Sequence, residues 1–125
     1  MNTMNSFGPS ENNRQKGNKG EQAAVEHLLS GGYSIICRQY RSKAGEIDIV
    51  ARDSDGTLVF IEVKSSAGNF CGNPLYRVTP QKQRKLARMA LQYITEHNIS
   101  GTPCRFDVIA VVGNKIDHLK NAFLV

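Results

Sequence analysis

The segment from Glu46 to Ser65 constrains the fold of this chain most strongly, because its pattern is that of a hairpin. Two runs rich in β-branched residues flank the short sequence Ser54-Asp55-Gly56. A glycine at the third position suits a three-residue turn, where it adopts the left-handed conformation. We therefore predict antiparallel strands over Glu46 to Arg52 and Thr57 to Ser65.

The register of this hairpin follows from the turn. If Asp53 faces Thr57, then Asp48 lies directly opposite Glu62. The same register sets Glu46 opposite Lys64. A slip of one residue would mix acids with isoleucines, which a buried face does not tolerate. The reverse face is then wholly apolar and comprises Ile47, Ile49, Ala51, Val59, Ile61 and Val63.

Glu62-Val63-Lys64 is the only acid-x-lysine sequence in the chain, and its acid and lysine share one face of the strand. Carboxylates facing each other across strands, as expected for Asp48 and Glu62, repel unless a cation lies between them. Mg²⁺ meets this need because it binds few carboxylates, keeps waters and takes a substrate phosphate as ligand. Lys64 could then stabilise charge on the phosphate or help activate the attacking water. The alternative is a solvated face of ion pairs formed by Glu46, Arg52, Glu62 and Lys64.

The remaining segments complete an α/β pattern of order αβββαββ in a single domain, residues 14–125, after a disordered tail, residues 1–13. Gly31-Gly32 ends the first helix, and Thr79 with Pro80 begins the second. A loop follows the hairpin over residues 66–77. The other predicted elements are helices at about Arg14 to Ser30 and Pro80 to His97, and strands at Tyr33 to Arg41, Arg105 to Val112 and Ile116 to Leu119.

Two polar residues lie on the apolar stripes of the predicted helices. Glu21 precedes Val25 and Leu28 at helical spacing, and Gln83 precedes Leu86 by three residues. Polar groups on core-facing stripes usually have partners, and a metal site would supply them. A capping or edge role for either residue is the alternative.

The net charge of +5 and the pI near 9.3 favour polyanionic partners, nucleic acid first. No apolar run is long enough to span a membrane, and no secretory signal is evident, so we expect a cytoplasmic protein that does not bind membranes. An odd number of cysteines without metal-binding spacing fits a reducing compartment. Cys37, Cys71 and Cys104 are interpreted as thiols without chemistry, and His27, His97 and His118 as surface or core residues.

Five motifs in order connect the chain to a known family. G-E-Q-A-A, G-E-I-D-I-V-A-R, F-I-E-V-K-S, V-T-P-Q-K-Q-R-K-L and C-R-F-D-V-I-A resemble the YraN family of small bacterial proteins, from about Gly17 to Phe123. That family is similar to the PD-(D/E)xK nuclease superfamily. The resemblance implies a restriction-endonuclease-like fold, with a mixed central sheet flanked by helices. Ile47 stands where the superfamily motif has proline.

The resemblance also implies roles for individual residues. Asp48 and Glu62 match the metal acids, Lys64 the catalytic lysine, Glu21 the acid of the first helix, and Gln83 the glutamine of the second. The implied cofactor is Mg²⁺, for which Mn²⁺ substitutes. The implied metal ligands are Asp48, Glu62, Val63 and Glu21.

Basic residues near both helix motifs could grip phosphates on either side of a cleavage point. A solvated basic helix face is the alternative. Tyr76 and Arg77 could stack on a base, and Asp107 could accept a hydrogen bond from a neighbouring loop. The basic residues are Lys16, Lys19, Lys82, Arg84, Lys85 and Arg88.

Three functions compete at this point. The first is a Mg²⁺-dependent endonuclease that hydrolyses phosphodiester bonds, in branched or structured DNA rather than RNA. The second is a non-catalytic nucleic-acid-binding module on a nuclease fold. The third is an accessory factor whose basic face binds an acidic protein. The small surface of the domain is compatible with a homodimer.

Overall fold

The computed structural model describes residues 9–66 and 78–123, with side chains from residue 19 onward. The order αβββαββ and the mixed sheet expected from the sequence are confirmed. The predicted roles of Cys71, Tyr76 and Arg77, the side chain of Lys16 and residues 1–8 of the predicted tail lie outside the described residues. The elements are α1 (Pro9–Ser30), β1 (Ser34–Ser42), β2 (Gly45–Arg52), β3 (Leu58–Ser66), α2 (Pro80–Glu96), β4 (Cys104–Val112) and β5 (Lys115–Leu119).

Helix α1 begins at Pro9, five residues before the predicted start at Arg14. Proline suits the first turn of a helix, where its missing N–H has no intrahelical partner anyway. The residues that follow Pro9 are polar, so hydrophobic periodicity could not reveal this turn. At the other end Gly32, with φ +89°, stops the helix as predicted, and Tyr33 N–H donates back to Leu28 O at 3.0 Å.

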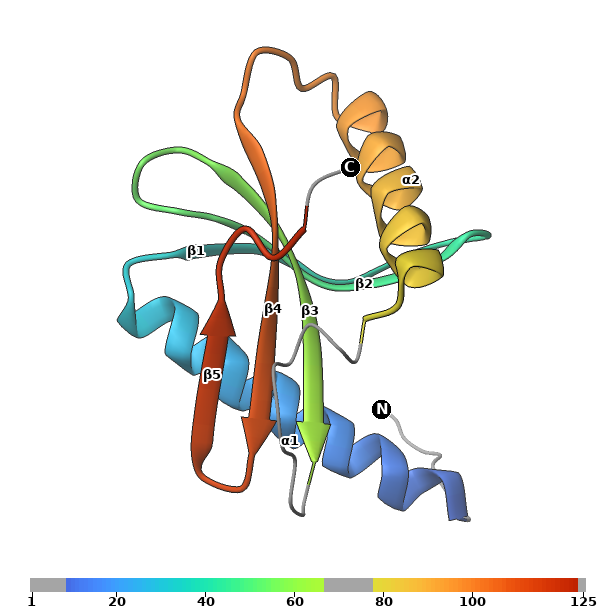
Figure 1. Cartoon of the computed structure of the whole chain (residues 1–125), viewed down its shortest axis with the longest axis vertical. Helices are drawn as coiled ribbons and strands as arrows, with labels where there is room; N and C mark the ends of the chain where they lie inside the picture. Colours follow the sequence, from blue (N-terminus) through green and yellow to red (C-terminus); the bar gives the residue numbers. More distant parts are fainter. Residues whose placement is uncertain (1–8, 67–77, 124–125) are drawn as a thin grey trace, which may run out of the picture.

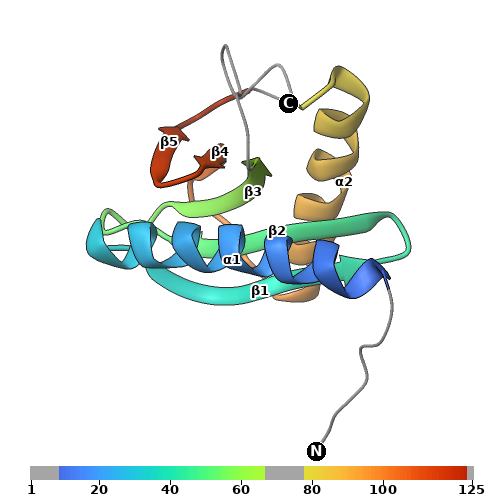
Figure 2. The same ribbon diagram turned by 90° about the horizontal axis from the view of Figure 1, so that it is seen from below.

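The five strands lie in the order β1-β2-β3-β4-β5 (Figure 1). Strands β1, β2 and β3 pair antiparallel, β3 and β4 pair parallel, and β5 returns antiparallel to β4. The parallel pair requires a crossover, which α2 provides. Helix α1 runs along one face of the sheet and α2 covers the other (Figure 2).

The hairpin register matches the sequence prediction. Asp53 N–H donates to Thr57 O at 2.9 Å, and Gly56 has φ +91°. Along the strands Ile49 faces Ile61, in the register that sets Asp48 against Glu62. Over the paired residues 49–52 and 58–61, the turn therefore fixes which side chains share each face of the sheet.

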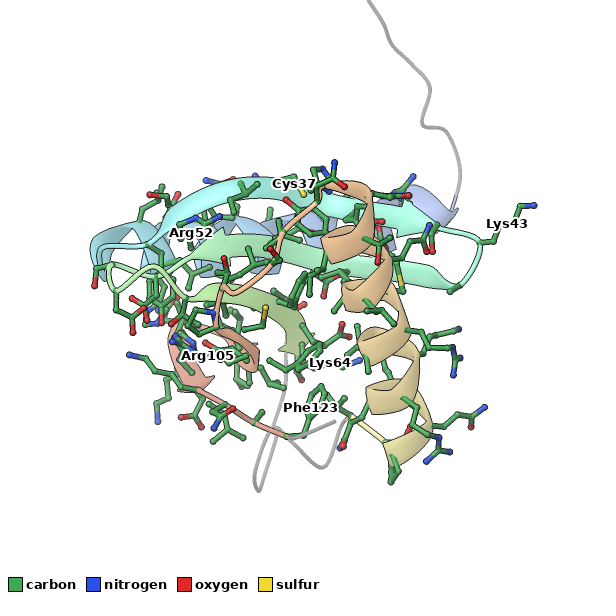
Figure 3. All side chains as sticks on the ribbon, turned by 90° about the horizontal axis from the view of Figure 1, so that it is seen from above. Cys37, Lys43, Arg52, Lys64, Arg105 and Phe123 are labelled. Carbon is green, nitrogen blue, oxygen red and sulfur yellow. The ribbon has the colours of Figure 1, made fainter. Side chains whose placement is uncertain are left out.

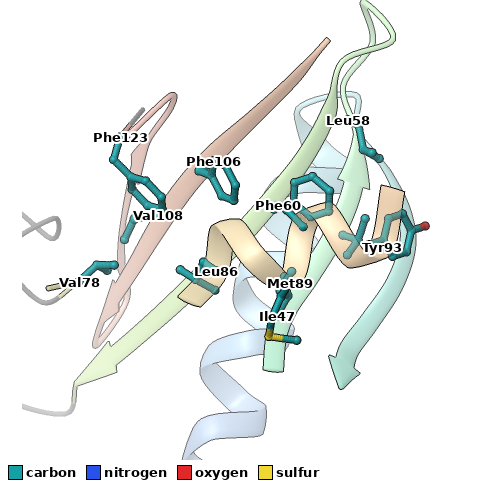
Figure 4. Packing of buried hydrophobic residues seen from close by; sticks show 12 residues of the cluster. Ile47, Leu58, Phe60, Val78, Leu86, Met89, Tyr93, Phe106, Val108 and Phe123 are labelled. Atoms are coloured by element: carbon teal, nitrogen blue, oxygen red, sulfur yellow. The ribbon is translucent and has the colours of Figure 1, made fainter. Parts of the chain in front are cut away.

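Both faces of the sheet are covered by apolar side chains. Ile49, Ala51, Val59 and Ile61 pack beneath α1, with Val63 partly buried beside them, as predicted. Under α2 a second cluster includes Phe60, Leu86, Met89 and Tyr93 (Figure 4).

One residue of the predicted apolar face is on the wrong side. Ile47 packs in the α2 cluster, near Met89, and not beneath α1 with Ile49 (Figure 4). The paired register of β2 and β3 ends at Ile49, whereas the pairing of β2 with β1 continues through Ile47 and Tyr40. A two-stranded ribbon twists more strongly than a wide sheet, and this turns Ile47 toward α2.

Helix α2 has the predicted cap. The hydroxyl oxygen of Thr79 accepts a hydrogen bond from Lys82 N–H at 3.2 Å, and Pro80 occupies the first turn. This cap fixes where the first turn of α2 begins, and therefore where Lys82 lies relative to the sheet. No helix in the described part of the chain is long and apolar enough to cross a membrane.

Candidate active site

The site begins where the β2–β3 ladder ends. Beyond the Ile49–Ile61 pair, the Asp48 side chain takes the place of a backbone partner: its Oδ2 accepts a hydrogen bond from Val63 N–H at 2.7 Å. The two strands diverge at this point (Figure 1), and Asp48 and Glu62 lie close enough at the opening for their charges to interact. The sequence prediction that these acids are cross-strand neighbours agrees with this geometry.

Asp48 forms no salt bridge with any described residue, although the charges of Asp48 and Lys82 interact at longer range. Burial and the neighbouring Glu62 carboxylate raise the pKa of Asp48 to about 7, and Glu21 and Glu46 add to the effect. The hydrogen bond from Val63 N–H acts in the opposite direction but does not balance them. The position therefore favours either a proton or a bound cation.

Glu62 has the opposite environment, because two lysines contact one of its oxygens. Lys64 Nζ lies 3.2 Å from Glu62 Oε2, and Lys82 Nζ, from α2, lies 2.6 Å from the same atom. Only 5% of Glu62 is exposed, so this is not the solvated face of ion pairs that the sequence left open. Figure 3 shows Lys64 between the sheet and α2.

The two lysines differ in their electrostatics. Burial and the adjacent Lys82 ammonium lower the pKa of Lys64. Burial alone would lower the pKa of Lys82 as well, but its contacts with Glu62 and Lys64 and the charge of Asp48 outweigh burial and raise it. The positive charge of Lys82 is therefore stabilised by its surroundings, whereas that of Lys64 is destabilised.

Glu46 was expected opposite Lys64, and the structure places it elsewhere. Arg41 Nε on β1 lies 3.0 Å from Glu46 Oε2. The strong twist of the β1–β2 ribbon beyond Ile49 carries Glu46 away from β3.

Glu21 lies close enough to the acids to contribute to the raised pKa of Asp48. It is 6% exposed, and two consecutive β1 residues bind its carboxylate. Arg38 Nε donates to Oε1 at 2.9 Å, and Gln39 Nε2 donates to Oε2 at 3.3 Å. Sequence reasoning missed both partners. The adjacent polar pair Arg38-Gln39, which interrupts the alternation expected of a strand, was the available signal.

Gln83 does not join the acids. Its Nε2 donates to Val78 O at 3.0 Å, just before the start of α2, which corresponds to the edge role that the sequence left open. In the described residues the α2 side chain that reaches the acids is Lys82, one position earlier. Residues of a first helical turn lean toward the N-terminus, which gives the long Lys82 side chain access to β3.

Most of the remaining predicted phosphate contacts are exposed. Lys19 lies on α1 beside the Glu21 pocket, and Arg84, Lys85 and Arg88 lie on the outer side of α2. Lys82 differs from them because it is half-buried on Glu62 and not free in solvent.

A metal ion would have oxygen ligands here. Within the part of the chain that the structure describes, no three His, Cys, Asp or Glu side chains form a metal-binding group by themselves. Asp48 and Glu62 supply carboxylates, and Val63 can contribute only its main-chain oxygen. One or two carboxylates with waters are what Mg²⁺ uses, and a bound cation would offset the burial and the Glu62 charge that raise the pKa of Asp48. These residues therefore fit the ion.

A second polar network lies under the C-terminal part of α1. Asp107, fully buried, accepts hydrogen bonds from Asn121 N–H at 2.9 Å and from Arg105 Nε at 3.0 Å. His118 Nε2 lies 2.7 Å from Asp107, and its Nδ1 lies 3.0 Å from His27. The expected bond from Asp107 to a neighbouring loop is thus present. Because its partners satisfy Asp107, this network ties α1, β4 and β5 together.

The fold is therefore that of an α/β protein whose paired acids lie where a mixed sheet opens. The family model described as "Uncharacterised protein family UPF0102" matches residues 20–111, and the chain belongs to this family. A UPF0102 protein of Desulfosudis oleivorans is 45% identical over 112 residues, which are 88% of this chain and 90% of the relative. A UPF0102 protein of Clostridioides difficile is 44% identical over 114 residues, which are 90% of this chain and 99% of the relative.

Solved structures give more distant likenesses. The "Structure of EndoMS-dsDNA2 complex" is 20% identical, with a TM-score of 0.44 over 76% of this chain and 37% of that chain. A repair endonuclease from Pyrococcus abyssi is 18% identical, with a TM-score of 0.45, and the match covers 77% of this chain and 39% of that chain. This chain thus spans well under half the length of either.

Proposed function

We propose that this protein is a Mg²⁺-dependent nuclease that hydrolyses phosphodiester bonds in nucleic acid. The observation that carries the proposal is the pairing of Asp48 and Glu62 at the strand opening, beside Lys64. Like charges held this close, with the pKa of one raised to about 7, indicate a site prepared for a cation. The net charge of +5 favours a polyanionic substrate.

Asp48, Glu62 and the main-chain oxygen of Val63 would hold the ion, with Glu21 behind Asp48. When bound, Mg²⁺ polarises a phosphate and lowers the pKa of bound water. Lys64 faces the same opening, and its ammonium is placed to stabilise negative charge that develops on the phosphate. Val63 N–H holds the Asp48 carboxylate in position, so the acids need little rearrangement.

A second function has one observation in its favour. Lys64 and Lys82 both contact Glu62 and balance its charge, which is an arrangement expected of a binding module that has lost catalysis. Such a protein would bind nucleic acid with a steep salt dependence and cut none of it. The choice of DNA over RNA and the homodimer remain predictions of the same proposal.

The test uses labelled linear, branched and single-stranded DNA, and the matching RNA, each with EDTA, Mg²⁺ or Mn²⁺. We expect metal-dependent cleavage by the wild type and loss of cleavage in Lys64→Ala with nearly unchanged affinity, because that lysine acts on the transition state. Lys85→Ala, an exposed lysine of α2, should weaken binding but still cut at saturating substrate. If no substrate is cut and Lys64→Ala weakens binding as much as Lys85→Ala, the protein is a binding module. Sedimentation with and without DNA tests the dimer.

A further inference from the structure

A polar pocket of about 500 Å³ lies between α1 and β1. Glu21 connects the pocket with the candidate active site, because it lines the pocket and its charge helps to raise the pKa of Asp48. The other lining residues also have polar or charged side chains, and the proposed mechanism uses none of them. They are Lys19, Gln22, Arg38 and Gln39.

The backbone of β1 is built to place two neighbouring side chains in this pocket. Successive residues of a regular strand point to opposite faces. Arg38 and Gln39 nevertheless both line the pocket and both bind Glu21. Gln39 has φ +55°, a conformation that glutamine rarely adopts and that breaks the alternation. Strained residues of this kind concentrate at functional sites.

The pocket has hydrogen-bond donors to spare. Arg38 Nε donates to Glu21 and its Nη1 donates to Gln22 at 3.0 Å, but Nη2 has no hydrogen bond to any described residue. The Arg38 side chain is 38% exposed. Lys19 is exposed at the rim, with no ion pair to the described residues. The Glu21 carboxylate is partly neutralised by its two β1 partners, so the pocket presents a net positive charge to a ligand.

We propose that this pocket is a subsite for a backbone phosphate of the nucleic acid, adjacent to the phosphate at the acids, with Arg38 and Lys19 as its contacts. The identity of the ligand rests on the proposed function. Because Nε and Nη1 of Arg38 are held by Glu21 and Gln22, the unbonded Nη2 is fixed in position to donate to a phosphate oxygen. Gln39 positions Glu21 and keeps Arg38 turned toward the pocket.

The competing explanation is that Arg38 only neutralises Glu21. Binding of a fluorescent DNA duplex in EDTA, titrated with salt, separates the two. We expect Arg38→Gln to weaken binding about tenfold and to flatten the salt slope by about one, as for one lost phosphate contact. Lys120→Gln, which removes the same charge near Tyr33 at the other end of α1, should change the slope little. Equal slopes for all three proteins would overturn the subsite.

The double variant Glu21→Gln/Arg38→Gln addresses the neutralising role directly. If Arg38 serves only Glu21, removing both charges restores wild-type affinity, and the proposal falls. If Arg38 contacts phosphate, the double variant stays weak. Arg38→Lys keeps the charge but loses the guanidinium nitrogens that Glu21 and Gln22 hold in position, so an intermediate loss is expected. A melting curve for each variant confirms that it is folded.

Duplexes with one neutral methylphosphonate linkage identify the phosphate. In the wild type, one position beside the cleavage site should weaken binding, and in Arg38→Gln that position should no longer matter. Insensitivity at every position, or the same sensitivity in both proteins, would overturn the subsite. Binding without cleavage would refute the proposed nuclease but leave the subsite. Cleavage by the wild type, with DNA affinity unchanged in Arg38→Gln, would support the nuclease and refute the subsite. If the protein binds no nucleic acid, both proposals are refuted.

Discussion

Lys82 on α2 and Glu62 on β3 form an ion pair in which Nζ lies 2.6 Å from Oε2. That ammonium occupies a carboxylate oxygen that a divalent ion would use, so the two cations compete for it. We expect Lys82→Met to bind Mn²⁺ about tenfold more tightly than the wild type, equivalent to about 1.4 kcal/mol. Calorimetry or metal-dependent melting measures it.

Lys85→Met is the matched control, because Lys85 lies on the same helix and is exposed. Its Mn²⁺ affinity should be that of the wild type. If Lys82→Met binds the ion more weakly than the wild type, Lys82 holds Glu62 in place for the metal and does not compete with it.

Asp48→Asn should make the metal-free protein more stable above pH 7. Burial and Glu62 raise the pKa of Asp48 from 3.8 to about 7, so the folded state holds the proton more tightly than the unfolded chain. Stability from this group is therefore present at low pH and is lost as the pH rises from about 4 to 7. Because a pKa difference of one unit corresponds to about 1.4 kcal/mol, and relaxation reduces the net effect, we expect a gain of roughly 1–3 kcal/mol at pH 8.

Urea unfolding in EDTA at pH 4, 6 and 8 measures this difference. At pH 4 the variant and the wild type should converge, since Asp48 is protonated in the folded wild type. A variant less stable than the wild type at pH 8 would show that Asp48 is ionised and well satisfied in the absence of metal.

Asp107→Asn should destabilise the protein without altering its affinity for nucleic acid. Burial would raise the pKa of Asp107, but hydrogen bonds from His118, Arg105 and Asn121 outweigh burial and leave it lowered. Removing the charge leaves Arg105, whose side chain is 14% exposed, with Asp53 as its remaining ion-pair partner and the Tyr33 hydroxyl as a hydrogen-bond acceptor. Breaking such a pair costs about 3 kcal/mol.

This loss should be full at neutral pH and should shrink as the pH falls below 4, through the lowered pKa of Asp107, because the wild type then also loses the charge. Urea unfolding at pH 3 and pH 7 tests the sign. A change in DNA affinity by a variant that remains folded would instead connect this network with the ligand.

Gln39→Gly should be more stable than Gln39→Ala by about 1 kcal/mol, because φ +55° strains alanine but not glycine. Both variants lose the amide that binds Glu21, so their difference isolates the backbone. At Ser34, an exposed β1 residue without positive φ, the order should be the reverse. If Gln39→Ala is more stable than Gln39→Gly, the backbone at position 39 changes its conformation in the variant and no longer has a positive φ.

The hairpin was predictable because two independent signals, the turn and the apolar pattern, agree on one register, and Asp48 and Glu62 follow from it. Which residue of α2 contacts the acids was not predictable from the sequence. Neighbouring helical positions point about 100° apart, and the length of each side chain decides which of them reaches the sheet. Periodicity favoured Gln83, whereas the long Lys82 side chain reaches Glu62. The polar pair Arg38-Gln39 signals a break in the strand alternation, but nothing in the residue type of Gln39 indicates its positive φ. The contact of Arg38 with Glu21 therefore could not be inferred from the sequence.

The topology also sets an order of assembly. Asp48, Glu62 and Lys64 all belong to the β2–β3 hairpin, whose contacts are local, whereas Lys82 arrives with the α2 crossover and the parallel β3–β4 pair. Local contacts close with less loss of chain entropy than distant ones. We expect mutations in the 53–57 turn to slow folding, and those in β4 and β5 mainly to speed unfolding. Asp48 and Glu62 would then come together on the hairpin while it is still in contact with water. Lys82 would reach Glu62 only later, when α2 packs on the sheet.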